Sequence, residues 1–184
     1  MQVEPLAIEG LWEITPLQRP DDRGVFLEAF KADVLSEAIG HPFTLKQMNV
    51  SVSSAGTVRG IHFADVPVGQ AKYVQCFSGA ILDVVVDIRV GSPTFGQWVG
   101  MELSEDNHRQ FWIPPGFAHG FVTLTDSADF LYKTTAYYSP AHDRSIVWND
   151  SKIGILWPDL GIDFQLSAKD LNASRLVDAD LFTV

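Results

Sequence analysis

The stretch TVRGIHFADVPVGQAKYVQCFSGAILDVVVDIRVGSPTFGQW, residues 57–98, decides the fold of this chain. It alternates short runs rich in β-branched and aromatic residues with breaks that contain Gly, Pro or Ser. In its longest run, Ala80–Arg89, residues such as Leu82 point to one face and residues such as Asp83 point to the other. Short strands joined by tight turns predict an antiparallel sheet, because such turns reverse the chain.

The same pattern continues on both sides of this stretch and leaves room for one clear helix. Helical spacing predicts a helix over Ala32–Ile39 that ends at Gly40. Turns or breaks are predicted at residues 20–24, 67–69 and 115–116. Further strands are predicted at Leu11–Thr15, Val25–Phe30, Leu45–Ser53, Phe95–Leu103, Gln110–Pro114, Phe117–Leu124 and Phe130–Tyr138. Many short strands with little helix indicate an all-β fold, an antiparallel β-sandwich or jelly roll, in a single domain over residues 1–184.

The composition fits a globular protein of the cytoplasm. Hydrophobic residues make up 46% of the 184 residues, yet no apolar run is long enough to span a membrane, and the N-terminus does not resemble a secretory signal. Cys76 is the single cysteine, so the chain forms no internal disulfide, which suits a reducing compartment. The net charge of −10 argues against nucleic acid as a partner, and any phosphorylated ligand needs a local cluster of cations.

In two predicted strands, the alternation of side chains does not decide whether the polar residues face solvent or a ligand. In Leu45–Ser53 the polar face around Asn49 lines either a wet cavity or the solvent side of a sheet. In Val25–Phe30, Glu28 shares a face with Phe26, so it is either a solvated residue of an edge strand or a ligand contact.

Two of the five histidines, His62 and His119, lie close to glycines in the predicted strands, and the other three are interpreted as surface residues. Jelly rolls of the metal-binding cupin type carry a His-x-His pair, a downstream Glu and a later His. Here Phe63 and Ala64 follow His62, and no Glu follows at the expected spacing. Two neutral imidazoles are too few ligands for a stable site, so no metal is expected.

The polar residues fit general acid–base chemistry better. His62 is the natural base near neutral pH, and Asp170 is a candidate for the carboxylate that orients it. Tyr132 is either a core tyrosine or an acid that delivers a proton to the opposite face of a ligand. Arg59 and Lys72 lie either on a solvated strand face or where they hold phosphate or a developing oxyanion.

A series of motifs along nearly the whole chain resembles the dTDP-4-dehydrorhamnose 3,5-epimerase family. The motifs are specific, and they occur in the family's order. They are Asp21-Asp22-Arg23-Gly24, Gln47-Met48-Asn49, Val58-Arg59-Gly60-Ile61-His62, Gln70-Ala71-Lys72, Leu82–Asp87, Gly91–Trp98, Ile113–Phe121, Phe130-Leu131-Tyr132-Lys133 and Leu166–Asp170.

The resemblance implies a cupin-type antiparallel jelly roll with a few short peripheral helices, a homodimer, and no cofactor or metal. It implies the substrate dTDP-4-dehydro-6-deoxy-D-glucose, inverted at C3 and C5 to give dTDP-4-dehydro-L-rhamnose. A C4 ketone acidifies the flanking C–H bonds, so inversion needs a base on one face, an acid on the other and donors for the enolate oxygen. No hydride moves in this reaction, and the chain shows no Gly-rich dinucleotide loop.

The resemblance also implies roles for individual residues. His62 resembles the family's base, paired with Asp170, while Tyr132 resembles the acid and Lys72 the group that stabilises the enolate. Strand parity indicates that Asp83 orients His119 or Lys72. Substrate-binding positions implied by the resemblance are Arg23, Phe26 and Glu28, which in the family reach in from the partner subunit, and Gln47, Asn49, Arg59, His119, Tyr138, Asp143 and Lys169.

Some positions depart from the family pattern and keep alternatives open. Asp143 replaces a common Glu, and Ala64 follows Phe63 where many members carry Gln. The sequence Ala71-Lys72-Tyr73 also occurs among relatives that make unusual deoxysugars, some of which invert only C3 or only C5. Because His62, Asp170 and Tyr132 are all present, the double epimerase is favoured over a mono-epimerase, and over a metal-dependent or non-catalytic cupin.

Overall fold

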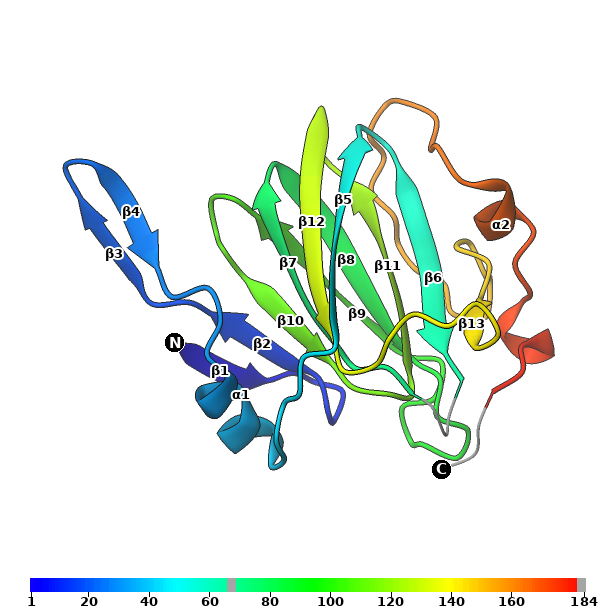
Figure 1. Ribbon diagram of the computed structural model, residues 1–184. Coiled ribbons are helices and arrows are strands. Elements are labelled where there is room, and N and C mark those ends of the chain that lie inside the picture. The colour runs from blue at the N-terminus through cyan, green and yellow to red at the C-terminus, as the bar shows by residue number, and fades with distance from the viewer. Residues whose placement is uncertain (66–68, 182–184) are drawn as a thin grey trace.

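Two antiparallel sheets face each other and form a β-sandwich in the computed structural model, which describes residues 1–65 and 69–181 (Figure 1). The six-stranded sheet consists, in spatial order, of β1 (Gln2–Pro5), β2 (Trp12–Thr15), β10 (Gln110–Ile113), β7 (Lys72–Ser78), β12 (Ser127–Thr134) and β5 (Gln47–Ser54). The five-stranded sheet consists of β13 (Asp143–Ser145), β6 (Val58–Ala64), β11 (Phe117–Thr123), β8 (Ala80–Asp87) and β9 (Trp98–Ser104). The predicted all-β jelly-roll class is therefore confirmed.

The core lies between the two sheets. Val74 of β7 and Phe130 of β12 enter it from the six-stranded sheet, and Val85 of β8 and Phe121 of β11 enter it from the other. The rings of Phe121 and Phe130 lie 4.6 Å apart between centroids, so the sheets meet through aromatic contact. Burial of these alternating apolar residues is what holds the two sheets together.

The helix α1 (Ala32–Ile39) has the predicted bounds. Gly40 ends it in the left-handed conformation, with φ of 79°, and donates its N–H to the carbonyl of Ser36. Leu35 is buried against Tyr73 and Trp112, whose side chains leave the outer face of the six-stranded sheet. The helix therefore covers the β2–β10–β7 part of that face. Two further short helices, α2 (Ala168–Leu171) and η1 (Leu176–Asp178), follow late in the chain.

The β5 end of the same outer face is bare. Met48, Val50 and Val52 are 56%, 58% and 67% exposed on this edge strand, and we refer to these three residues as the apolar strip. The opposite, polar face of β5 points inward, where Ser53 is only 3% exposed. Of the two interpretations of this strand, the inward polar face is therefore confirmed.

A hairpin of β3 (Gln18–Asp21) and β4 (Gly24–Leu27) projects away from the sandwich (Figure 1). Its turn includes Gly24, with φ of 128°, a conformation that favours glycine. Phe26, which pairs with Arg19 across the hairpin, is 66% exposed. This large apolar side chain is not part of any core cluster of the described residues, so packing within its own chain does not explain it.

Several predicted boundaries were wrong. The strand β12 ends at Thr134, because the Thr134 hydroxyl donates to the carbonyls of Gln47 and Ala136 and turns the chain, so Tyr138 lies in a loop. The strand predicted at Val25–Phe30 ends at Leu27. The strands β1 and β13 and the helix α2 were not predicted. The break predicted at residues 67–69 lies outside the described residues, except for Gly69.

None of the described helices has the length and apolar composition needed to cross a membrane.

Candidate active site

A cavity of 260 Å³ opens between the two sheets, and the charged and aromatic residues singled out in the sequence meet in it. Both sheets and the α2 segment contribute to its wall. The lining residues are Ser51, Arg59, His62, Lys72, His119, Phe121, Phe130, Tyr132, Ser167, Lys169 and Asp170. The four predicted catalytic residues, His62, Lys72, Tyr132 and Asp170, are thus all present in one cavity.

His62 and Asp170 form a hydrogen-bonded pair at one wall. His62 Nε2 lies 2.6 Å from Asp170 Oδ1, although the two residues are 108 positions apart in the chain. Burial raises the pKa of the Asp170 carboxyl, but hydrogen bonds from His62 and Ser167 outweigh it and hold that pKa below its usual value. When Nε2–H donates to this carboxylate, the neutral ring carries its lone pair on Nδ1, where it can accept a proton.

A β-bulge in β6 places Arg59 and His62 in the same cavity. Strict alternation would put residues three apart on opposite faces of the strand. Here His119 of β11 pairs with His62 and Phe121 pairs with Arg59, so β6 has one residue more than its partner between these pairs. Arg59 Nε donates to Ser53 Oγ at 3.0 Å, which fixes the guanidinium at the cavity wall.

Tyr132 enters from the opposite sheet. It lies on β12, with its ring 5.5 Å from that of Phe130, and packs against the core. Burial raises the pKa of the Tyr132 hydroxyl, so the group keeps its proton at neutral pH. A protonated phenol facing a histidine across a cavity is suited to act as the acid.

Lys72 begins β7 beside the cavity. Burial lowers the pKa of its ammonium to about 8, and the charges of Asp83 and Asp143 only partly oppose this. The group is still cationic at neutral pH, in surroundings where little water screens it. It can therefore stabilise a developing oxyanion strongly.

His119 is paired with Asp83 beneath the cavity. His119 Nδ1 lies 3.4 Å from Asp83 Oδ1, and the other carboxyl oxygen has no hydrogen-bond partner among the described residues. Burial, with the charges of Lys72 and His62, lowers the pKa of His119 well below its usual value, so the ring is neutral. Burial raises the pKa of Asp83 well above its usual value, opposed in part by Lys72. Of the two partners expected for Asp83, His119 is the one that it contacts directly, and the orienting role itself stays a prediction.

The remaining predicted residues of the main body form a network beside the cavity. Asp143 Oδ2 accepts hydrogen bonds from Tyr138 at 3.1 Å and from Lys169 Nζ at 2.5 Å. Gln47 donates to Asn49 Oδ1 at 2.8 Å and accepts from the Tyr138 N–H at 2.8 Å. The shorter Asp143 side chain, in place of the family's common Glu, thus makes both contacts through one carboxylate oxygen.

Arg23, Phe26 and Glu28 are not brought to this cavity. They lie on or next to the projecting β3–β4 hairpin, and none of them lines the cavity. Arg23 is paired with Asp21 at 2.6 Å, with its side chain 89% exposed.

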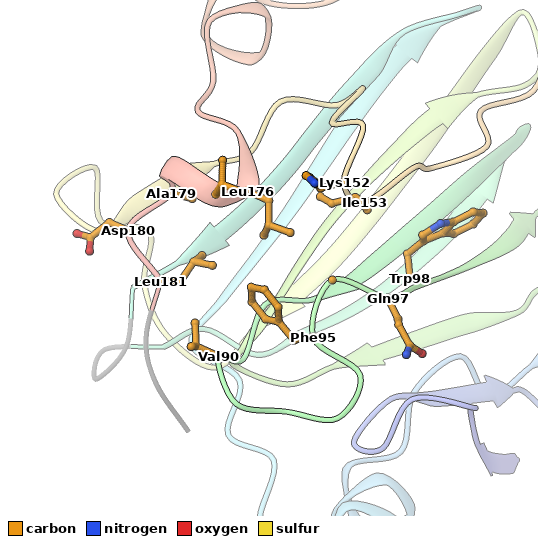
Figure 2. Close-up of a pocket in the computed structure, with 12 residues that line it drawn as sticks. Val90, Phe95, Gln97, Trp98, Lys152, Ile153, Leu176, Ala179, Asp180 and Leu181 are labelled. Carbon is orange, nitrogen blue, oxygen red and sulfur yellow. The ribbon is translucent and has the colours of Figure 1, made fainter.

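A larger hollow lies elsewhere in the molecule. It is a groove of 1220 Å³ whose wall includes Phe95 and Trp98 on one side and Leu176 on the other (Figure 2). Lys152 and Asp180 are its charged residues, and none of the predicted site residues lines it. Because the predicted acid, base and cation line the smaller cavity, that cavity is the candidate active site.

The described residues contain no group of three or more His, Cys, Asp or Glu side chains placed to hold a metal ion. His62 and His119 are cross-strand neighbours, but each is engaged with a different aspartate.

Sequence reasoning missed Ser167 and the aromatic pair Phe121 and Phe130, and it left the setting of Ser51 open. Phe121 and Phe130 lie in motifs quoted for the family, but an apolar strand residue carries no sign that it lines a cavity. Ser167 could have been found, because Ser three residues before Asp170 has the spacing of a helix N-cap.

Comparisons with known proteins agree with this geometry. A family model described as dTDP-4-dehydrorhamnose 3,5-epimerase matches residues 5–178. A dTDP-4-dehydrorhamnose 3,5-epimerase of Salmonella typhimurium strain LT2 is 49% identical over 183 residues, covering 100% of this chain and 99% of its own. A dTDP-4-dehydrorhamnose 3-epimerase of Streptomyces niveus is 49% identical over 179 residues, covering 97% of this chain and 86% of its own. A solved structure from Legionella pneumophila, a dTDP-6-deoxy-D-glucose-3,5-epimerase in complex with dTDP-4-keto-L-rhamnose, is 46% identical with a TM-score of 0.92, covering 97% of this chain and 94% of that one.

Proposed function

The chain belongs to the dTDP-4-dehydrorhamnose 3,5-epimerase family, and on this premise we propose that it inverts C3 and C5 of dTDP-4-dehydro-6-deoxy-D-glucose to give dTDP-4-dehydro-L-rhamnose. The observation that carries the proposal is that the two proton-transfer groups come from opposite sheets of the sandwich. His62 comes from the five-stranded sheet and Tyr132 from the six-stranded sheet, and both line one cavity. A sugar ring held between them would have a base on one face and an acid on the other.

The reaction follows from these positions. His62 Nδ1 removes the proton from the carbon next to the C4 ketone, and the electron pair moves to the C4 oxygen. The Lys72 ammonium stabilises the resulting enolate. Tyr132 then delivers its proton to the opposite face of the same carbon, and solvent returns the proton of Tyr132 and takes that of His62. Repeating these steps at the second carbon completes an isomerisation without net change in oxidation state.

Binding of the nucleotide diphosphate is proposed for the cations of the cavity. Arg59, Lys72 and Lys169 are concentrated there in a chain of net charge −10, which supplies the local positive potential that a phosphorylated ligand needs. His119 lines the same cavity, and the network of Gln47, Asn49, Tyr138 and Asp143 beside it would offer donors and acceptors for the sugar and the base.

We also propose that two copies of the chain associate through the apolar strip. Met48, Val50 and Val52 form a bare apolar surface on an edge strand, which a second copy could cover. The β3–β4 hairpin points away from its own sandwich, so Arg23, Phe26 and Glu28 would reach the partner's cavity instead of their own.

A cytoplasmic location is proposed on the state of the cysteine. Cys76 is buried, and burial raises the pKa of its thiol to about 11, so it persists as an unreactive thiol. A chain with one such thiol suits a reducing compartment.

The experiment that tests the function is NMR of the sugar nucleotide in D2O. Wild-type protein should introduce deuterium at both C3 and C5 and yield dTDP-4-dehydro-L-rhamnose. Exchange and inversion at C3 alone would identify a 3-epimerase, the second candidate, because a relative of equal identity carries that name. No exchange at either carbon would remove the epimerase function, and activity that depends on an added metal would favour a metal-dependent cupin.

A further inference from the structure

The two carboxylate oxygens of Asp170 have different donors. Oδ1 is held by His62 Nε2 at 2.6 Å, and Oδ2 accepts a hydrogen bond from the Ser167 hydroxyl at 2.9 Å. The same Ser167 oxygen accepts the N–H of Asp170 at 3.1 Å. Ser167 therefore contacts both the backbone and the side chain of the residue that orients the base.

The setting of α2 makes this contact important. A helix of four residues has too few internal hydrogen bonds to hold its own shape. The segment is tied to the sandwich at Gln165, through two hydrogen bonds of 2.9 Å to Gly56 and Val58, and again at Ser174, which accepts from Val147 at 2.8 Å. Asp170 lies between these two ties and is 3% exposed, so its carboxylate is enclosed on a short segment.

We propose that Ser167 is a positioning residue of the reaction, and that His62, Asp170 and Ser167 act as one hydrogen-bonded triad. The torsion that rotates a carboxylate about its last bond has broad, shallow preferences. The Ser167 hydroxyl fixes this rotation by holding Oδ2, which aims Oδ1 at His62 Nε2. His62 is thereby kept in the tautomer that presents Nδ1 to the substrate. This inference rests on the proposed role of His62 as the base.

Ser167 also caps α2, and the two roles can be separated by substitution. Glycine at a helix N-cap costs only a few tenths of a kcal/mol relative to serine, but it has no hydroxyl. Threonine keeps both the cap and the donor. Ser167→Gly therefore removes the contact to Oδ2 with little loss of capping, and Ser167→Thr should restore it.

The matched control for the added backbone freedom is Ser174→Gly. It lies on the same segment, and its side chain makes no hydrogen bond among the described residues. Its backbone, which makes the tie to Val147, is retained. Ser174→Gly should leave kcat within about twofold of wild type.

The test measures kcat and KM of these variants by the appearance of inverted product. Ser167→Gly should lower kcat roughly tenfold with KM within about twofold, because the lost hydrogen bond is made to a charged group and acts on the base. Ser167→Thr should recover most of the rate. A Ser167→Gly variant with wild-type kcat, or a loss that Ser167→Thr does not repair, would overturn the proposal.

A second measurement tests whether Ser167 acts on the rate through Asp170. In an Asp170→Asn background, followed by deuterium exchange at stoichiometric enzyme, Ser167→Gly should cause no further loss of rate. The same tenfold loss in that background would show that Ser167 acts elsewhere. Failure of the proposed function would be distinct, because wild-type protein would then exchange no deuterium at all.

Discussion

Burial, neighbouring charges and hydrogen bonds together leave the residues of the cavity in the protonation states that the reaction needs. Tyr132 has a raised pKa and keeps its proton, His119 has a lowered pKa and is neutral, and Lys72 has a pKa of about 8. Asp170 has a lowered pKa and is ionised. An acid, a cation and an orienting carboxylate are therefore available together near pH 7.

A fall in activity above pH 8 is the first prediction. Burial depresses the pKa of Lys72 from 10.5 to about 8, so its charge is present below that pH and is lost above it. Tyr132 does not titrate in this range, because its pKa is raised from 10.0. The profile of kcat/KM against pH should therefore decline above about 8, and Lys72→Met should lower the rate and abolish this limb.

Lys133→Met is the control for this prediction. Burial also lowers the pKa of Lys133 to about 8, but its Nζ lies 5.2 Å from the ring centroids of Phe30 and Tyr73, away from the cavity lining. The alkaline limb should persist in this variant. If the decline of kcat/KM above pH 8 were unchanged in Lys72→Met, a group other than Lys72 would cause it.

Among the elements, the crossing of β6 and β11 decides where the base lies. Gly60 of β6 and Gly120 of β11 touch at the bulge, and a Cβ on Gly120 would lie 2.6 Å from the carbonyl oxygen of Arg59. A Cβ on Gly60 would lie 2.6 Å from the Gly120 Cα. Only two glycines allow the strands to approach so closely, and this approach sets His62 opposite His119.

Gly120→Ala should therefore destabilise the protein. The added methyl group meets backbone atoms, which cannot move aside as a flexible side chain can, so we expect a loss of roughly 1–3 kcal/mol in the free energy of unfolding. Denaturation in urea measures it. Gly100→Ala on β9 is the control, because the nearest atoms there belong to side chains at 3.2 Å or more. Equal stability of the two variants would contradict the account of the crossing.

Local pattern predicted most elements and failed where distant segments meet. The period of two located the central strands, and helical spacing with Gly40 gave α1 its bounds. No local signal shows that Asp170 reaches His62, since the α2 segment is placed by ties to β6 and to residues beyond it. Strand parity alone would also have separated Arg59 from His62, because the bulge depends on pairing with β11.

At the scale of the whole molecule, the β3–β4 hairpin projects away from the sandwich that encloses the cavity (Figure 1). Arg23 and Phe26 lie on the projecting hairpin, while the cavity lies between the sheets. In the dimer that we propose, the hairpin of one copy reaches the cavity of the other. A complete site would then need two chains.

Mixing of two inactive variants tests this arrangement. His62→Ala disables a cavity, and the double change Arg23→Ala and Phe26→Ala disables a hairpin. In a mixed dimer the intact cavity would receive the intact hairpin of its partner, so co-refolded variants should recover about a quarter of the wild-type rate. No recovery from two variants that are each inactive would mean that hairpin and cavity act within one chain, and a double variant that is active by itself would mean that the hairpin has no role.

Replacing Val50 and Val52 together by lysine tests the contact surface itself. These side chains are exposed on one edge strand, so the change should leave the fold intact and shift the protein to monomers in sedimentation experiments. Activity should fall with the dimer fraction. A fully dimeric double variant would place the interface elsewhere.

The most direct test of the central claim, a base and an acid on opposite faces of the sugar, is the stereochemistry of deuterium uptake in Tyr132→Phe. This variant keeps His62 but loses the acid, so NMR in D2O should show deuterium entering C3 and C5 mainly with retention of configuration, while inverted product falls sharply. His62→Ala should lose both exchange and inversion by about 10²–10⁴-fold. Inversion at the wild-type rate in Tyr132→Phe, or undiminished exchange in His62→Ala, would contradict the assignment.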